Sequence, residues 1–285
     1  MDIVDAQLHL SLSPGVDEII AAMDALGVAS VVLDEVWGRN AHDHATPCVE
    51  FGDGAYRPLS PCAQAASLRY PNRFSFLQRV TRRDPQLAAL IPVLASSPGC
   101  RSLRIVLGSR DERDAFAAGD YDALLGLAQG HGLPISFLSK DTGVLLSGAV
   151  KRFPDLQFVI DHCGWGKTGQ EWSRVLELAH HGNTYLKWSH AHRAFSQSDM
   201  TVKPDETIQR EFQRAIDAFG VERMLWASDA THEETGASWT ELLSFVLHNP
   251  AISAGDKQWI LAKTARQVFR WAEAAPIATR DSRYP

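Results

Sequence analysis

The feature of this sequence that most limits its fold is an alternation of short apolar segments with longer amphipathic segments, which persists along the chain. The short segments are rich in β-branched residues, as buried parallel strands are. The longer segments have apolar residues at helical spacing, and some end at a glycine. This order of segments predicts parallel β-strands that are connected by crossover helices.

Eight segments have the character of strands. They cover residues 3–9, 29–34, 73–80, 102–107, 134–138, 156–163, 184–189 and 223–228. Helical segments follow at residues 16–26, 63–69, 84–95, 110–129, 143–153, 170–180, 206–219, 238–248 and 256–274. Eight such strands predict a single α/β domain, a (β/α)8 TIM barrel, which commonly takes about 250 residues. We expect the barrel to span residues 1–275 and residues 276–285 to form a C-terminal tail.

One long stretch, from residue 35 to residue 62, interrupts the alternation. Its glycines and prolines are too frequent for a regular element. A connection of this length in a compact domain is usually functional or mobile. We therefore expect a long loop after the second strand that acts as a lid, with His42 and His44 as weaker candidates for a role.

Composition excludes several classes of protein. The formal net charge of −6, with 28 Lys+Arg and 34 Asp+Glu, argues against a nucleic-acid partner. The four cysteines lack the spacing of a zinc or redox motif and look like reduced thiols. No signal peptide is recognisable, and no apolar run approaches the ~18 residues of a membrane helix. We expect a cytoplasmic protein that acts on a small molecule, makes no membrane contact and forms a homodimer.

Polar side chains gather where the predicted strands end. In a barrel of this kind these ends face the active-site mouth. The residues are Gln7, His9, Asp34, Gln78, Arg79, Arg104, Ser139, Lys140, Asp161, His162, Trp165, Lys187, Ser189, His190, His192, Asp229 and His232. Several histidines are among them, so we expect catalysis at this end of the barrel.

Four phrases in the sequence resemble the amidohydrolase superfamily. They are Asp5 to His9, Phe158 to Gly164, Tyr185 to Ser189 and Arg223 to Asp229. The resemblance spans all eight strands and is nearest to the amidohydrolase-related branch, which holds sugar lactonases, pyrone dicarboxylate lactonase and nonoxidative decarboxylases. The superfamily's pattern is His-x-His after strand one, a His after strands five and six, and an Asp after strand eight.

Carried over to this sequence, the resemblance assigns His9, His162 and Asp229 to the catalytic centre. Two positions depart from the pattern, because Gln7 stands where the first His would be and the fifth strand, 134–138, has no His. A neutral amide is a poor replacement for imidazole at a zinc site. Members of the lactonase branch can also work without metal. We therefore expect no cofactor, the alternative being one zinc or manganese ion on His9, His162 and Asp229.

The first functional hypothesis is a lactonase, a hydrolase that opens a small cyclic ester on a carboxylated or sugar-like ring. Asp229 would act as general base on water, while His162 and His9 polarise the carbonyl. Each residue alone has a structural explanation, such as a helix N-cap for Asp229. The alternatives are a metal-dependent nonoxidative decarboxylase or hydrolase of the same superfamily, and a barrel without catalysis that serves as a binding subunit.

Six further residues are expected to contact the substrate. They are Arg104, Lys187, Gln7, His190, His192 and Trp165. Arg104 and Lys187 would hold an anionic group of the substrate, with the guanidinium as the main anchor. The alternative is structural, because a barrel interior can hold two cations when carboxylates such as Asp34 and Asp161 compensate them.

Overall fold

A computed structural model describes residues 1–10, 15–36, 47–166, 169–195, 204–231 and 237–272. Eight parallel strands form one sheet in sequence order. They are β1 (Val4–Leu10), β2 (Ser30–Glu35), β5 (Phe74–Arg79), β6 (Cys100–Leu107), β7 (Ile135–Ser139), β8 (Phe158–Ile160), β9 (Thr184–Trp188) and β10 (Met224–Trp226). The first and last strands meet where the Asp229 amide donates to the Gln7 carbonyl oxygen, 3.0 Å away. The sheet is a nearly closed barrel, and the predicted α/β TIM-barrel fold is confirmed.

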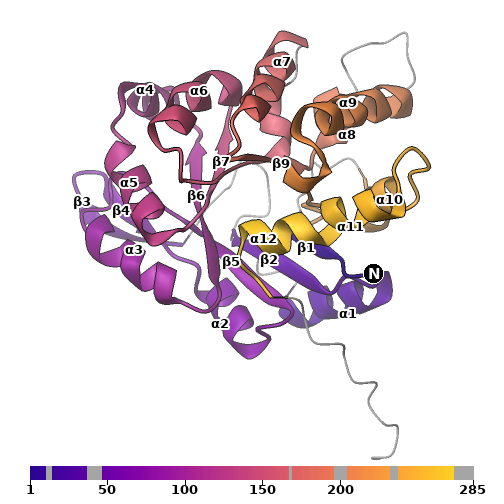
Figure 1. Ribbon diagram of the computed structural model, residues 1–285. Helices are drawn as coiled ribbons and strands as arrows, with labels where there is room; N and C mark the ends of the chain where they lie inside the picture. Colours follow the sequence, from indigo (N-terminus) through magenta and orange to yellow (C-terminus); the bar gives the residue numbers. More distant parts are fainter. Residues whose placement is uncertain (11–14, 37–46, 167–168, 196–203, 232–236, 273–285) are drawn as a thin grey trace, which may run out of the picture.

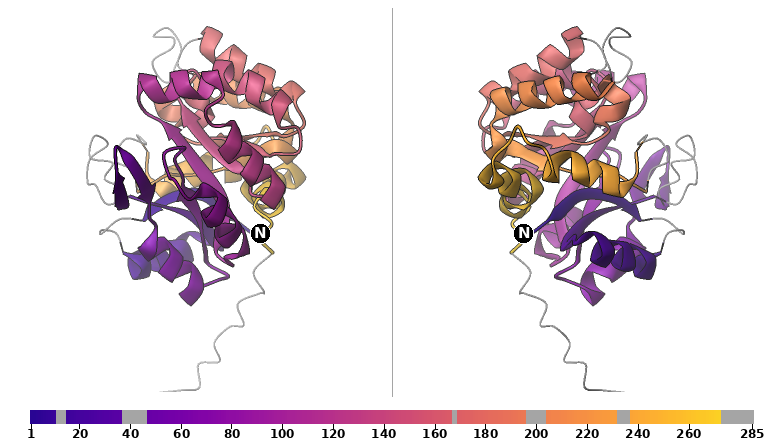
Figure 2. Two further views of the ribbon diagram at one scale, coloured as in Figure 1. Left: turned by 90° about the vertical axis from the view of Figure 1, so that its left-hand side faces the viewer. Right: turned by 90° about the vertical axis from the view of Figure 1, so that its right-hand side faces the viewer.

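Helices lie outside the strands (Figure 1), and the side views of Figure 2 show the same arrangement. They are α1 (Val16–Leu26), α2 (Pro61–Arg69), α3 (Leu87–Ser96), α4 (Arg110–Ala118), α5 (Asp122–His131), α6 (Thr142–Arg152), α7 (Gly169–Glu177), α8 (Ala191–Phe195), α9 (Pro204–Phe219), α10 (Trp239–Leu247), α11 (Ala254–Gln258) and α12 (Thr264–Val268). Short 3₁₀ turns lie at His162–Trp165, Leu178–His180 and Val221–Arg223, and a π-helical segment at Trp259–Lys263. No helix in the described ranges is long and apolar enough to cross a membrane.

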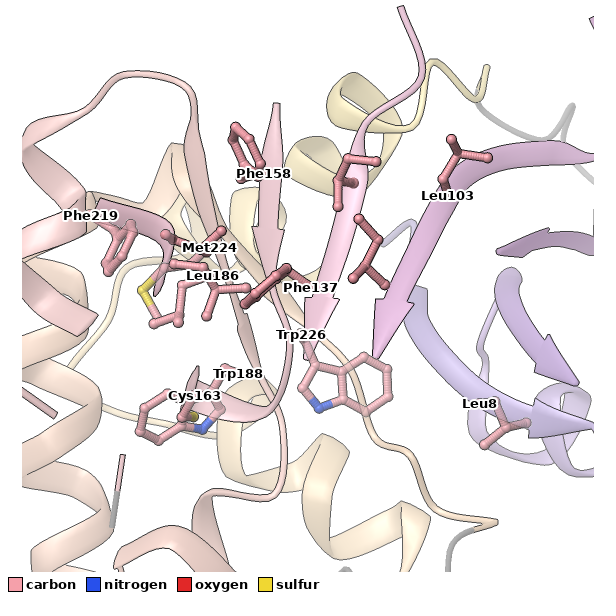
Figure 3. Packing of buried hydrophobic residues seen from close by; sticks show 14 of the residues in the cluster. Leu8, Leu103, Phe137, Phe158, Cys163, Leu186, Trp188, Phe219, Met224 and Trp226 are labelled. Atoms are coloured by element: carbon pink, nitrogen blue, oxygen red, sulfur yellow. The ribbon is translucent and has the colours of Figure 1, made fainter. Parts of the chain in front are cut away.

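Two groups of buried apolar side chains stabilise the barrel. Figure 3 shows part of the larger group, in which four consecutive strands contribute Phe137, Phe158, Leu186 and Met224. The smaller group takes alternate strand residues, among them Val32, Leu77, Val159 and Leu225. Because side chains along a strand alternate between its faces, the two groups lie on opposite faces of the sheet. This packing fixes the strand register that brings the polar strand ends together.

The stretch between residues 35 and 62 contains a regular element, contrary to expectation. β3 (Cys48–Gly52) and β4 (Ala55–Pro58) form an antiparallel hairpin. The two residues between them, Asp53 and Gly54, have φ values of +50° and +73°. A two-residue hairpin turn of the favoured type needs positive φ at both positions. Gly54 therefore forms part of the turn that connects β3 to β4, and it does not interrupt the regular structure.

Some expectations concern residues outside the described ranges. His42, His44 and His232 are among these residues, and so is the expected tail, 276–285. The roles of these histidines, the lid function of the loop and the domain boundary stay predictions. The structure contains one chain, so the homodimer also stays a prediction.

Candidate active site

An irregularity in β1 brings Gln7 and His9 into the barrel. Asp5 and Leu8 are three residues apart, yet they pair with residues of β2 that are only two apart. The extra residue of this bulge changes which side chains point inward. Gln7 is fully buried and His9 is nearly so, and both contact side chains from the last strands of the barrel.

Asp229 follows β10 and lies fully buried among three imidazoles. Its Oδ1 is 3.2 Å from His9 Nε2, and its Oδ2 is 2.7 Å from His190 Nε2 and 3.6 Å from His162 Nε2. Burial alone would raise the pKa of this carboxyl, but His9 and a hydrogen bond from His190 hold the pKa well below its usual range. The structure therefore groups an ionised Asp229 with the predicted His9 and His162, and makes His190 its direct hydrogen-bond donor.

The backbone of Asp229 is held in an uncommon conformation, with φ at +52°. On one side, Asp5 of β1 accepts hydrogen bonds from the Ser228 N–H, at 2.9 Å, and from the Ser228 hydroxyl. The same hydroxyl oxygen accepts the Ala230 N–H at 3.1 Å. The Asp229 N–H itself donates to Gln7 of β1. Contacts with the first strand thus fix the direction in which the carboxylate points.

The Asp5 carboxyl gives a prediction about stability. Burial raises its pKa to about 7, although hydrogen bonds from Ser228 lower it in part. A carboxyl with a raised folded-state pKa contributes stability at low pH and loses that contribution as pH rises through this pKa. Between about pH 5 and pH 8, we expect Asp5→Asn to gain on the order of 1–4 kcal/mol in free energy of unfolding relative to wild type. Urea unfolding across this range measures the difference.

Asp84→Asn is a matched control for this measurement. Asp84 is also buried, but its ion pair with Arg57 at 2.6 Å lowers the pKa of the carboxyl. Its contribution is lost only as pH falls below the usual carboxyl range, so the Asp84→Asn difference should stay constant between about pH 5 and pH 8. A constant difference for Asp5→Asn as well would contradict the raised pKa.

His162 begins a tight left-handed turn. All four residues from His162 to Trp165 have positive φ, between 51° and 65°. The turn packs closely on α7, because a Cβ added at Gly164 would lie 2.6 Å from a methyl carbon of Val175. Glycine is therefore required here by space, and it also adopts the positive φ without strain. The result is a buried His162 ring next to Asp229.

The contacts of His162 determine where its proton lies. Burial, together with His190, lowers the pKa of His162 well below its usual value, so the imidazole is neutral. Arg104 Nη2 lies 3.4 Å from Nε2, and a guanidinium can only donate, so this nitrogen carries the lone pair. The proton is then on Nδ1, which lies 2.9 Å from Ser189 Oγ. In this tautomer Nε2 has no proton to give to a substrate carbonyl, a role that the resemblance implies for His162.

A continuous network of ion pairs crosses the barrel interior. Asp34 accepts hydrogen bonds from Arg79 at 2.9 and 2.6 Å, and another from Arg104. Asp161 lies 2.9 Å from Arg104 Nε and 2.9 Å from Lys187 Nζ. Arg104 and Lys187 are almost fully buried. These contacts favour the structural alternative for both cations, and their role as substrate anchors stays a prediction.

The network remains charged and extends to Asp229. Burial alone would raise the pKa of Asp34, but Arg104 and Arg79 hold this pKa well below its usual range. Asp34 Oδ2 also lies 3.2 Å from His9 Nδ1. Since His9 Nε2 faces Asp229, this histidine joins the network to the Asp229 carboxylate.

Aromatic rings lie beside these groups. The Trp165 ring centroid is 5.5 Å from that of His190, and the Arg193 guanidinium carbon lies 5.1 Å from the Trp165 centroid. This places the rings of Trp165 and His190 side by side. His192 lies in α8, with its ring centroid 6.3 Å from that of Phe245 in α10. Substrate contact by these residues stays a prediction.

Sequence reasoning left Asp5, Arg79 and Arg193 out of the candidate site. Arg79 had a usable signal, since it lies at a predicted strand end, and it completes the charge balance around Asp34. Asp5 contacts Ser228 only because the first and last strands are neighbours. A local sequence pattern does not report that proximity.

Three side chains at the centre could hold a metal ion. The ligand atoms of His162, His190 and Asp229 all lie within 4.8 Å of one another. Imidazole and carboxylate are ligands that zinc uses. The Nε2 lone pair of His162, with Nδ1 held by Ser189, also suits a metal ligand. The set fits a divalent ion and contains His190 in place of the His9 that the resemblance implies.

A family model described as amidohydrolase matches residues 60–271. No curated protein matches the chain. Among solved structures, an amidohydrolase from Burkholderia multivorans with bound zinc has a TM-score of 0.75 at 17% identity, covering 95% of this chain and 100% of that one. A protein from Acinetobacter baumannii described as a probable 2-pyrone-4,6-dicarboxylic acid hydrolase, with citric acid bound, has a TM-score of 0.71 at 15% identity, with coverage of 95% and 100%.

A third solved structure comes from a different reaction class. It is the 5-carboxyvanillate decarboxylase of Novosphingobium aromaticivorans, in complex with manganese and 4-hydroxy-3-methoxy-5-nitrobenzoic acid. Its TM-score is 0.63 at 14% identity, with coverage of 94% of this chain and 96% of that one. At these identities, the three likenesses show a shared fold.

Proposed function

Because the chain belongs to the amidohydrolase family, we propose that this enzyme is a lactonase that opens a small cyclic ester, with Asp229 as the general base. The observation that carries the proposal is the state of that side chain. It is buried at the end of β10, ionised, and oriented by His9 and His190. A carboxylate in this state can take a proton from water as the water attacks an ester carbonyl.

The proposed reaction uses one water molecule. Asp229 takes a proton from the water, and the water oxygen forms a bond to the lactone carbonyl carbon. The tetrahedral intermediate then breaks its bond to the ring oxygen, which receives the proton from Asp229. The product is an open-chain hydroxy acid, and Asp229 is again ionised. Its hydrogen bond from His190, at 2.7 Å, holds the carboxylate in place during these steps.

The proposed substrate is a carboxylated or sugar-like ring. The similar structure described as a probable 2-pyrone-4,6-dicarboxylic acid hydrolase, which has citric acid bound, supports the carboxylated class. Arg193, which is only partly buried, supplies positive charge beside Trp165, whose ring in turn lies next to His190. Trp165, beside Arg193, offers an aromatic face for the ring.

We further propose that the reaction proceeds without a metal ion. Gln7 replaces a histidine ligand of the superfamily, and β7 contains no histidine. The buried carboxylates Asp34, Asp161 and Asp229 are already balanced by Arg79, Arg104 and Lys187. A divalent ion would add two charges to that balance, at a cost in desolvation.

The second candidate function is a metal-dependent decarboxylase or hydrolase, and the donor set at the centre favours it. His162, His190 and Asp229 are the residues that would hold the ion. When bound, such an ion would polarise a carbonyl or lower the pKa of water. In that case Asp229 would be a ligand, and its hydrogen bond from His190 would be replaced.

Metal removal tests the first candidate against the second. After dialysis against dipicolinic acid, we expect turnover of lactones to stay within about twofold of the untreated enzyme, because the proposed base is a side chain. The substrates are tested as a panel of lactones that contains 2-pyrone-4,6-dicarboxylate and the aldono-1,4- and aldono-1,5-lactones. Elemental analysis measures the metal that remains on the protein. A loss of activity that zinc or manganese restores would refute metal independence.

The same panel separates the remaining alternatives. Release of carbon dioxide from 5-carboxyvanillate in the presence of manganese, without lactone hydrolysis, would support the decarboxylase. A protein that acts on none of these compounds, with or without metal, would contradict the proposed function.

A further inference from the structure

Among the residues that the structure describes, the side-chain amide of Gln7 has an oxygen that is hydrogen-bonded and a nitrogen that is not. Its Oε1 lies 2.9 Å from Lys187 Nζ. Its Nε2, on a side chain with no solvent exposure, makes no hydrogen bond within the described part of the chain. A buried donor without an acceptor typically costs ~1–3 kcal/mol, so a native structure that keeps one calls for an explanation.

The neighbours of Gln7 fix which way its amide faces. An ammonium group donates hydrogen bonds and accepts none, so the amide oxygen must be the atom next to Lys187. Lys187 in turn lies 2.9 Å from Asp161, which Arg104 also binds at 2.9 Å. With its oxygen held by this chain of contacts, Gln7 has both N–H groups of Nε2 left for another acceptor.

The free donor lies on the residue that adjoins the catalytic base. The Gln7 carbonyl oxygen accepts the Asp229 N–H at 3.0 Å, and the bulge in β1 turns the Gln7 side chain into the barrel. An ester hydrolase needs a base for water and a donor for the carbonyl oxygen. Asp229 supplies the base, while the tautomer of His162 leaves its Nε2 without a proton.

We propose that Gln7 is a catalytic residue whose Nε2–H donates a hydrogen bond to the substrate carbonyl oxygen and to the oxyanion that forms there. Lys187 is a positioning residue that holds the amide in the required orientation. This inference rests on the proposed lactonase function and deepens it. It gives the residue that departs from the superfamily's metal-binding pattern a specific task.

Two substitutions test the donor. Gln7→Glu keeps the oxygen that faces Lys187 but removes both N–H groups, and Gln7→Met removes them without adding charge. Loss of one oxyanion donor costs about 10²–10³-fold in kcat. We expect both variants to lose kcat by about that factor while KM changes much less, because the contact strengthens in the transition state. Steady-state kinetics on the best lactone of the panel measures the two constants.

Gln78 provides a matched control. It is also a buried glutamine at a strand end, but its Nε2 already donates to Pro58 O and Arg79 O, both at 2.9 Å. Gln78→Met should lower the free energy of unfolding, because two buried acceptors lose their donor. It should leave kcat near the wild-type value.

A spectroscopic readout separates a donor from a merely structural residue. The probe is the lactam analogue of the lactone that the enzyme hydrolyses fastest, labelled with ¹³C at the carbonyl. It is bound to wild type and to each variant. Isotope-edited infrared difference spectra then report the carbonyl stretch. We expect a lower frequency in wild type and in Gln78→Met than in Gln7→Met, because a hydrogen bond to the oxygen weakens the carbonyl bond.

The outcomes are distinguishable. A wild-type enzyme that hydrolyses no lactone of the panel overturns the proposed function and this inference with it. An active wild-type enzyme whose kcat and carbonyl frequency are unchanged in folded Gln7→Glu and Gln7→Met overturns the role of Gln7 alone. Equal losses of kcat in Gln7→Met and Gln78→Met, with no difference in carbonyl frequency, also overturn it, because they assign Gln7 a structural role.

Discussion

Asp229→Asn should reduce kcat of lactone hydrolysis by about 10²–10⁴-fold, the range for loss of a general base. The amide keeps the shape of the side chain, but it cannot accept the proton of the attacking water. The wild-type carboxylate is ionised because His9 and the hydrogen bond from His190 overcome the effect of burial on its pKa. Steady-state kinetics on protein whose folding is checked by circular dichroism measures the effect.

The control for this variant is a buried aspartate outside the site. Asp84 is 4% exposed and forms an ion pair with Arg57. Asp84→Asn should reduce stability while leaving kcat near the wild-type value, because its carboxylate has no contact with the imidazoles in the described structure. Retained activity in a folded Asp229→Asn variant would overturn the assignment of the base.

Arg104→Met should lower the free energy of unfolding by about 3–5 kcal/mol, as expected when one partner is removed from a buried ion pair. Asp34 would keep Arg79 and the contact with His9, and Asp161 would keep Lys187. The methionine side chain fills most of the space but supplies no donor. Urea unfolding measures the change, and Arg152→Met is a control because its pair with Asp122 is well exposed and contributes about 0–1 kcal/mol.

The same variant tests the substrate-anchor hypothesis. If Arg104 binds a carboxylate of the substrate, Arg104→Met should raise KM for carboxylated lactones and spare uncharged ones. A variant that is as stable as wild type and shows this selective change in KM would contradict the structural role. A loss of stability, with equal effects on both substrate types, would remove Arg104 from the list of substrate contacts.

The sequence was sufficient to predict the barrel because its strands are short apolar runs that recur between amphipathic segments. Each of the eight predicted strands overlaps an observed one, and the first helix was predicted at its observed bounds. The hairpin at 48–58 was missed, since Gly52, Gly54 and Pro58 look like breakers when their backbone angles are unknown. Helix α8 was missed because five residues are too few to show a helical period.

The candidate site was only partly predictable. His9, His162 and Asp229 were expected to lie together because each lies at or just after the end of a predicted strand, and all parallel strands end at the same mouth of the barrel. The structure brings these three side chains together. The tautomer of His162 and the orientation of Gln7 depend on contacts with Arg104 and Lys187. These contacts follow from side-chain packing across the barrel, which strand order alone does not specify.

The contacts that hold Asp229 link parts of the chain that are far apart in sequence. The bond from Ser228 to Asp5 joins residues separated by 223 positions. Closing such a long stretch of chain has a high entropic cost, so we expect these contacts to form late in folding. During refolding from urea, recovery of activity should therefore lag behind recovery of helical signal. Turnover in this protein should then report completed ring closure, and we expect none from a half-barrel fragment.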